Sequence, residues 1–192
     1  MEDYTKYKWF YTSSGKLVVG GKSASQNDEL LRMLKHSKND FITAHTSEPG
    51  SPFSIILEDV SKVTDQDIKE CATFTACFSR AWKLGIKKAS VDIFTLSQVY
   101  KLDNMKTGTW GVKGKIKKIT CDLMLLLVVQ KKTLRAIPPM SVKSKEKIFL
   151  QIVPGTLDKK DMLPKLQIEL HEQFSNEELL SALPSGGLKI LR

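Results

Sequence analysis

The stretch that decides the fold is Cys71-Ala72-Thr73-Phe74-Thr75-Ala76-Cys77-Phe78-Ser79, which carries no charged residue. It lies in the middle of a helix predicted from about Asp65 to Leu84, which Thr64 can cap at its N-terminus and Gly85 can end. A helix that is weakly polar all round is usually buried on more than one side. We therefore expect this helix to form the centre of the core.

Short strands are expected on both sides of this helix. Trp9 to Thr12 and Lys16 to Val19 flank Ser13-Ser14-Gly15 and predict a β-hairpin. Further strands are expected at about 40–44, 53–57, 89–95, 111–119 and 122–129. The sequence thus predicts an α+β fold, with a mostly antiparallel sheet and a central buried helix.

A C-terminal extension of one strand and one or two helices is expected after this region. The strand is predicted at 149–153 and to end at Pro154-Gly155, with a helix at about 159–173. Ser175 and Glu178 form a capping box for a second helix. We predict two units, a nucleic-acid-binding domain at 1–147 and an extension at 148–192 that packs on it.

Charge supports this division and indicates a polyanionic partner. The 192 residues have a formal net charge of +9, and only four of the 30 basic residues are arginines. Residues 1–147 have a net charge of +10, whereas residues 148–192 have a net charge of −1. Lysine is suited to phosphate and arginine to base edges, so the pattern favours contacts with a nucleic-acid backbone. The alternative is a general bias of composition towards lysine.

The compartment is expected to be the cytoplasm. The acidic N-terminus has no apolar segment of the kind found in signal peptides. The most apolar run, Leu123 to Val129, is too short to span a bilayer, so no membrane association is expected. Cys71, Cys77 and Cys121 show no metal-ligand spacing and are expected to be reduced thiols.

A candidate anion site lies at Gly20-Gly21-Lys22-Ser23, where a strand passes into a helix. Backbone N–H groups at a helix N-terminus favour phosphate, and Lys22 can add a direct contact. The spacing from Gly15 does not fit a P-loop, so nucleotide hydrolysis is not expected. The alternative is that the glycines only form the turn.

A second candidate site is the alternating segment Val112-Lys113-Gly114-Lys115-Ile116-Lys117. On a strand, Lys113, Lys115 and Lys117 would share one face, next to Trp110 as a stacking platform and Lys101 as a further cation. Alternatively, these lysines form a solvated face or protect an edge strand.

No catalytic or metal motif accompanies these basic residues. His45 precedes a polar turn that contains Ser51, so a Ser–His pair is conceivable, but no G-x-S-x-G elbow is present. His, Asp and Glu show no zinc or magnesium spacing, and we expect no catalytic residue, metal or cofactor.

Several blocks between about Tyr7 and Pro138 resemble those of a known family. The blocks are Trp9-Phe10, Ser13-Ser14-Gly15, Leu17 to Lys22, Gln26-Asn27, Ala44-His45, Pro49 to Pro52, Glu70 to Trp82, Gln98-Val99-Tyr100-Lys101 and Gly108 to Ile116. Together they resemble the NFACT-R family, whose opening block reads approximately W-F-x-S-S-x-x-x-L-V-I-G-G-[KR]-[DS]-A-x-Q-N-E. Ser97, where eukaryotic members usually have His, and Lys115, where a small Ser is usual, depart from the family pattern.

The resemblance implies a domain that binds RNA in ribosome-associated quality control. Larger members bind the large ribosomal subunit and tRNA and promote tailing of stalled nascent chains. This chain resembles a free-standing member of the kind common in archaea, so the tailing activity is not carried over. Free-standing eukaryotic relatives include a DNA-sensing surface protein, so DNA stays open as a ligand.

Three functions are compatible with the sequence. The first is binding of tRNA or rRNA through the lysine-rich face, in translation or ribosome-associated quality control. The expected contacts are Lys22, Gln26, Asn27, His45, Ser51, Gln98, Lys101, Trp110, Lys113, Lys115 and Lys117. The second is an RNA-processing or RNA-modifying enzyme with a polar site around His45. The third is a ribosome-docking interaction module.

Overall fold

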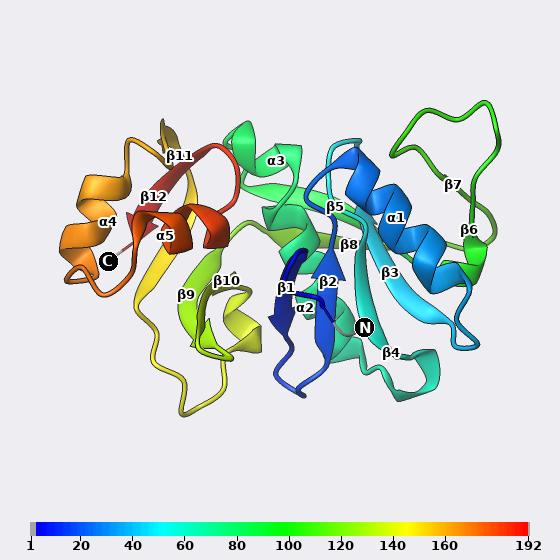
Figure 1. Cartoon of the computed structure of the whole chain (residues 1–192), viewed down its shortest axis with the longest axis horizontal. Coiled ribbons are helices and arrows are strands. Elements are labelled where there is room, and N and C mark those ends of the chain that lie inside the picture. The colour runs from blue at the N-terminus through cyan, green and yellow to red at the C-terminus, as the bar shows by residue number, and fades with distance from the viewer. Residues whose placement is uncertain (1–2, 192) are drawn as a thin grey trace.

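Residues 3–191 are described by the computed structural model of the chain, which has two large antiparallel sheets, one two-stranded antiparallel sheet and five α-helices in this range (Figure 1). The first sheet has the order β1-β2-β4-β3-β5-β8. Its strands are β1 (Lys8–Tyr11), β2 (Leu17–Gly20), β3 (Phe41–Thr46), β4 (Ser54–Asp59), β5 (Lys88–Thr95) and β8 (Lys117–Asp122). The predicted α+β class and the β1–β2 hairpin are confirmed.

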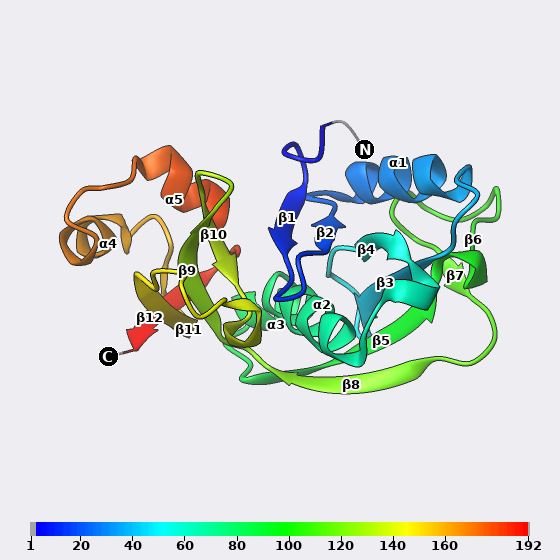
Figure 2. The same cartoon turned by 90° about the horizontal axis from the view of Figure 1, so that it is seen from below.

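This sheet curls around helix α2 (Asp65–Cys77), while α1 (Ala24–Lys35) covers its outer face (Figure 2). Phe10 of β1 and Phe74 of α2 pack with ring centroids 4.6 Å apart. Cys71 to Cys77 are all buried, so the prediction of a central core helix is confirmed. Thr64 caps α2 through a capping box with Asp67.

The central helix ends earlier than the sequence predicts. A single helix from about Asp65 to Leu84 is wrong, because α2 ends at Cys77 and a short α3 follows at Arg80–Lys83. Ser79 explains the interruption, since its hydroxyl donates to the Ala76 carbonyl at 2.7 Å and accepts from the Ala81 N–H at 3.1 Å. Ser79 thus serves the end of one helix and the start of the next.

The predicted strand at 111–119 is also wrong. Only Gly111–Val112 (β7) pairs with Val99–Tyr100 (β6), and β8 begins at Lys117. Gly114 between them has a φ of +84°, a left-handed conformation that interrupts extended backbone. The lysine ladder therefore does not form, because Lys113 and Lys115 lie in the connection and not on a strand.

The second sheet has the order β10-β9-β11-β12. Its strands are β9 (Leu125–Gln130), β10 (Thr133–Ile137), β11 (Leu150–Asp158) and β12 (Gly187–Leu191), with α4 (Leu163–Glu169) and α5 (Asn176–Ala182) beside them. The prediction that a strand ends at Pro154-Gly155 is wrong, because β11 continues to Asp158 with a register shift between Pro154 and Leu157.

Strands from both sides of residue 147 share this second sheet. β9 and β10 precede the predicted boundary, and β11 and β12 follow it. The division at 147 and 148 stays a prediction. No helix in the described part of the chain is long and apolar enough to cross a membrane.

The two sheets meet along the outer edge of β1. The Gln130 side chain accepts from the Tyr11 N–H at 2.8 Å and donates to the Tyr11 carbonyl at 3.0 Å, as a neighbouring strand would. On the other side of the junction, the Trp82 indole donates to the Gly187 carbonyl at 2.9 Å. One continuous hydrophobic core extends from α2 into the second sheet.

Candidate nucleic-acid interface

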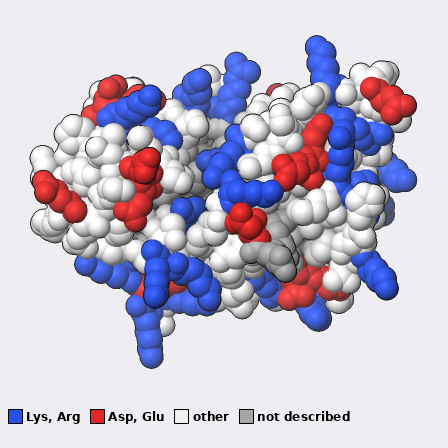
Figure 3. All heavy atoms as spheres, in the orientation of Figure 1, with Lys and Arg blue, Asp and Glu red and all other residues white. Residues whose placement is uncertain are grey.

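A hollow of about 600 Å³ brings together residues that are distant in sequence. Its walls come from the turn between β2 and α1, the loop between β3 and β4, and the segment 107–112. Of the predicted contacts, the hollow is lined by Lys22, Asn27, His45, Ser51 and Trp110. The space-filling view shows the surface hollowed between the two halves of the molecule, with Lys and Arg side chains along it (Figure 3).

The turn between β2 and α1 presents a helix N-terminus to this hollow. A Cβ on Gly21 would lie 2.2 Å from Asn27 Oδ1, so only glycine allows this close approach. Asn27 Oδ1 also accepts from the Phe53 N–H at 3.2 Å, which ties α1 to β4. The Ser23 hydroxyl caps Gln26 N–H, as the sequence predicts. This packing fixes the first turn of α1 at the hollow.

Lys22 is exposed at this helix N-terminus. Burial of part of its side chain lowers its pKa, and the charge of Arg135 lowers it further. The Gln26 side chain does not reach into the hollow as a free group, because its Oε1 accepts from the Lys22 N–H at 2.7 Å and its Nε2 donates to the Lys6 carbonyl. Lys22 and the α1 N-terminus together favour an anion.

The buried carboxylate of Asp28 holds the opposite wall of the hollow. It accepts from the Trp110 indole at 2.7 Å, the Gly108 N–H at 2.9 Å and the Lys101 ammonium at 3.2 Å. Burial acts to raise the pKa of Asp28, but these hydrogen bonds outweigh it and hold the pKa below its usual value. The segment 101–110 is thereby fixed against α1.

Lys101 therefore has a structural position and is not available for phosphate. Its ammonium also donates to the carbonyls of Lys106 and Thr109, at 2.8 and 2.9 Å, and its side chain is only 15% exposed. The Trp110 ring, which its indole N–H anchors to Asp28, lines the hollow.

His45 lines the hollow as a neutral ring. Burial lowers its pKa, against the opposing effects of the Thr46 carbonyl and the Asp92 charge. Its Nδ1 lies 2.7 Å from the Thr46 carbonyl, which requires the proton on Nδ1 and leaves the lone pair on Nε2. The ring packs on Phe53 with centroids 4.5 Å apart. His45 thus offers a hydrogen-bond acceptor and an aromatic face.

Ser51 and His45 do not form a catalytic pair. The Ser51 hydroxyl accepts from the Thr46 N–H at 2.9 Å and donates to the Pro52 carbonyl at 3.0 Å, so its proton is directed to the backbone. Ser51 stabilises the β3–β4 loop. Among residues 3–191 there is no cluster of His, Cys, Asp or Glu that could hold a metal ion.

The remaining predicted contacts lie outside the hollow. The Gln98 side chain donates to the carbonyls of Lys113 and Lys115, at 2.7 and 2.9 Å, and so fixes the connection between β7 and β8. Lys113 and Lys115 are exposed on this connection. Lys117 pairs with Asp65 at 3.2 Å on the surface. These lysines can contribute to a basic rim but not to a strand-borne ladder.

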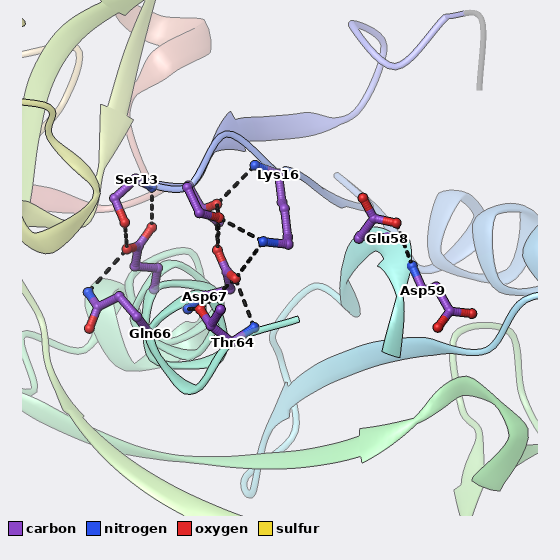
Figure 4. A network of polar contacts seen from close by, with 10 residues as sticks. Ser13, Lys16, Glu58, Asp59, Thr64, Gln66 and Asp67 are labelled. Atoms are coloured by element: carbon purple, nitrogen blue, oxygen red, sulfur yellow. Dashed lines mark hydrogen bonds and ion pairs between the residues drawn. The ribbon is translucent and has the colours of Figure 1, made fainter. Parts of the chain in front are cut away.

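The Ser-Ser pair of the opening block supports the fold and not the hollow (Figure 4). The Ser14 hydroxyl donates to Asp67 at 2.5 Å, and Ser13 donates to Glu70 through its N–H at 2.8 Å and its hydroxyl at 2.5 Å. Asp67 also pairs with Lys16 at 3.0 Å. The two buried acids of α2 thereby hold the β1–β2 turn.

Sequence reasoning missed Lys8 and Phe78, which line the hollow on the side of the second sheet. The Lys8 ammonium lies 4.4 Å from the centroid of the Phe78 ring. A signal was present, because strand alternation places Lys8 on the same face as the buried Phe10. Lysine is rarely buried without a partner, so a lysine at an inward-facing strand position is a candidate functional residue.

The fold and the hollow define an α+β domain with a basic site beside a sheet junction. The family model described as the NFACT protein RNA binding domain matches residues 6–114, and the chain belongs to this family. This agrees with the resemblance found in the sequence from about Tyr7 to Pro138.

Curated relatives extend the similarity to nearly the whole chain. The archaeal Rqc2 homolog aRqcH of Methanocaldococcus jannaschii is 25% identical over 202 residues, which cover 98% of this chain and 29% of that protein. The ribosome quality control complex subunit NEMF homolog of Drosophila melanogaster is 25% identical over 207 residues, which cover 97% of this chain and 20% of that protein. The chain thus spans less than a third of these relatives.

A solved structure shares the fold. The C-terminal part of the fibronectin/fibrinogen-binding protein from Streptococcus suis superposes with a TM-score of 0.52 and 22% sequence identity, over 60% of this chain and 44% of that one.

Proposed function

We propose that this protein binds RNA in the hollow, through phosphate contacts from Lys22 and the N-terminus of α1. The observation that carries the proposal is the convergence of a cation, a helix N-terminus and aromatic rings on one hollow of about 600 Å³. Lysine and helix N-termini bind phosphate, and aromatic side chains stack on unpaired bases. The family's description as an RNA-binding domain supports the same ligand.

Side chains of the hollow can contact both the bases and the riboses of an RNA. Trp110 offers a ring for a base, and the lone pair of His45 Nε2 can accept a hydrogen bond from a ribose hydroxyl or a base amino group. Asp92 is an acid of the lining, and it is paired with Lys118 at 3.3 Å. Repulsion of a phosphate by this wall is therefore reduced.

We further infer that the RNA is tRNA or rRNA and that the protein acts beside the ribosome in the cytoplasm. The names of the curated relatives, which are ribosome quality control proteins, support this inference. Lys113 and Lys115 would extend the contact at the rim, because they follow Val112 of the lining directly.

A titration of fluorescein-labelled tRNA, followed by anisotropy at several salt concentrations, tests the proposal. Reversing the charge of Lys22 with Lys22→Glu should weaken binding by about tenfold or more, because a hydrogen bond to a charged group contributes about 1.5–3 kcal/mol. Lys145→Glu is the matched control, since it makes the same change of charge at an exposed site outside the hollow.

The two variants separate local contacts from net charge. Equal affinity of Lys22→Glu and Lys145→Glu would contradict a specific role of the hollow. The same titration with duplex DNA, and co-sedimentation with ribosomes, distinguish RNA binding from DNA binding and from docking through protein contacts.

A further inference from the structure

Four cationic side chains from separate parts of the fold converge where the two sheets meet. Lys8 begins β1, Lys22 lies before α1, Arg135 lies on β10 and Lys159 follows β11 directly. Burial, followed by the charges of Lys159, Lys22 and Arg135, lowers the pKa of Lys8 to about 8. The charge of Arg135 also acts on Lys22. The geometry agrees: Lys8 and Lys22 line the same hollow, and Lys8 and Arg135 line a small crevice beside it. Ser181 also lines this crevice, and the carbonyl of the preceding Leu180 accepts from Lys159.

Two of these cations are held in place by aromatic rings. Lys8 Nζ lies 4.4 Å from the centroid of Phe78, and Arg135 Cζ lies 4.6 Å from the centroid of Trp9. Arg135 is 8% exposed, and its Nε donates to the carbonyl of the preceding residue at 2.7 Å. Such contacts fix the direction of a cation without neutralising its charge.

Lys159, which is half-buried, is positioned by the end of α5. Its ammonium donates to the Leu180 carbonyl at 2.7 Å. Burial lowers the pKa of Lys159 and is the largest influence on it. The charge of Asp158 acts to raise this pKa, and the charge of Lys160 acts to lower it.

Carboxylates pair with other lysines of the chain but not with these. Lys16 pairs with Asp67 at 3.0 Å, and Lys101 pairs with Asp28 at 3.2 Å. Within the described range, neither Lys8, Lys22, Arg135 nor Lys159 forms an ion pair with an acid. Gathering unpaired cations in a partly buried place destabilises a fold, which indicates a ligand that compensates the charge.

We propose that Lys8, Lys22, Arg135 and Lys159 form a phosphate-binding subsite at the junction of the two sheets, which holds one phosphate group of a bound RNA. The identity of the ligand rests on the RNA-binding function proposed above. The subsite goes beyond that function, because Arg135 and Lys159 lie outside the residues 6–114 that the family model matches. RNA would then contact both halves of the molecule.

The shape of the junction places the phosphate on the hollow side of Lys8. Lys8 and Lys22 both line the large hollow, together with Ser185 from the second half. Behind Lys8, a crevice of about 10 Å³ between Phe78 and Arg135 has no room for a phosphate group. Lys8 and Lys22 thus make the direct contacts, and Arg135 and Lys159 add charge from behind.

Binding of a short single-stranded RNA, labelled with fluorescein at its 3′ end, tests the subsite. Lys8→Met removes the charge but keeps an apolar side chain of similar length, and Lys22→Met does the same on an exposed turn where folding is not at risk. Each should weaken binding by about tenfold and lower the salt dependence of log K by ~0.7. Lys38→Met, an exposed site remote from the junction, is the control and should bind as the wild type does.

A second measurement needs no RNA. Sodium pyrophosphate should raise the melting temperature of the wild-type protein above its value in sodium chloride of equal ionic strength, because a ligand of the folded state stabilises it. Lys8→Met should show no such rise. Absence of the rise in the wild type would overturn the subsite.

The two proposals fail in different ways. If the wild type does not bind RNA but pyrophosphate stabilises it, the proposed function is wrong and the subsite remains. If the wild type binds RNA and both Lys8→Met and Lys22→Met bind it as tightly, the subsite is wrong. A comparison of RNA that has a 5′ phosphate with RNA that has a 5′ hydroxyl shows which phosphate the subsite binds. Tighter binding of the 5′-phosphorylated RNA assigns a terminal phosphate, and equal binding of the two assigns a phosphodiester.

Discussion

The partly buried Lys8 makes the stability of the protein depend on pH. Its pKa falls from the ordinary 10.5 to about 8 in the folded protein, chiefly because of burial. Between these values the unfolded chain binds more protons than the folded chain, so the free energy of unfolding rises with pH from about 8 to about 10.5. Below pH 8 the folded protein carries the full cost of the charged ammonium.

The gap between 10.5 and about 8 corresponds to about 3 kcal/mol. The contact of Lys8 Nζ with the Phe78 ring, at 4.4 Å, is lost with the charge. Such a contact stabilises by about 0.5–2 kcal/mol. Lys8→Met should therefore raise the free energy of unfolding at pH 7 by about 1–3 kcal/mol, and this gain should disappear by about pH 10.5.

Urea unfolding of the wild type, Lys8→Met and Lys38→Met at pH 7 and at pH 10, in a buffer free of phosphate, measures the effect. Lys38→Met should match the wild type at both values, because Lys38 is exposed. A Lys8→Met variant that is less stable than the wild type at pH 7, or whose difference from it is the same at both values, would refute the reasoning.

Two further predictions concern the walls of the hollow. Gly21→Ala places a Cβ 2.2 Å from Asn27 Oδ1, so it should cost about 1–3 kcal/mol in urea unfolding and weaken RNA binding; unchanged values for both would contradict the close approach. Asp28→Ala leaves the Trp110 indole and the Gly108 N–H without their acceptor and removes the ion-pair partner of Lys101. It should therefore cost about 2–4 kcal/mol and raise the mobility of Trp110 in fluorescence anisotropy. Because the pKa of Asp28 is lowered on folding, its contribution to the free energy of unfolding should be complete above its ordinary pKa of 3.8 and be lost at lower pH. The same difference in free energy of unfolding between the wild type and Asp28→Ala at pH 7 and at strongly acid pH would contradict this.

Local signals in the sequence were sufficient for much of the fold. The turn at Ser13-Ser14-Gly15, the cap at Thr64 and the uncharged centre of α2 predict elements that the structure contains. Each depends on interactions within a few residues, which a pattern records directly. The capping box of Ser175 and Glu178 before α5 is confirmed for the same reason.

Elements that depend on distant partners were not predictable in this way. The alternation around Gly114 is typical of a strand, but the left-handed φ of Gly114 and the Gln98 side chain hold the segment as a connection. Strand β10 was missed entirely, and with it the place of Arg135 beside Trp9. The order of the strands, and not their composition, creates that contact.

The sequence predicts some residues of the candidate site but not others. The turn at Gly21 and Lys22 and the aromatic Trp110 were found as motifs, and the fold brings them together. Lys101 has the composition of a phosphate ligand but is engaged by the buried Asp28, which no spacing reveals. Lys8 was missed because the predicted strand begins at Trp9, whereas β1 begins at Lys8 and strand alternation places Lys8 on the face of Phe10.

Ultraviolet crosslinking of bound tRNA, with the attached peptides mapped by mass spectrometry, tests the central claim most directly. An RNA in the hollow should crosslink to peptides that contain residues 21–24 and 107–112, and Lys22→Glu should reduce both crosslinks while Lys145→Glu leaves them unchanged. Crosslinks confined to other surfaces, such as the exposed lysines of β8, would contradict the account.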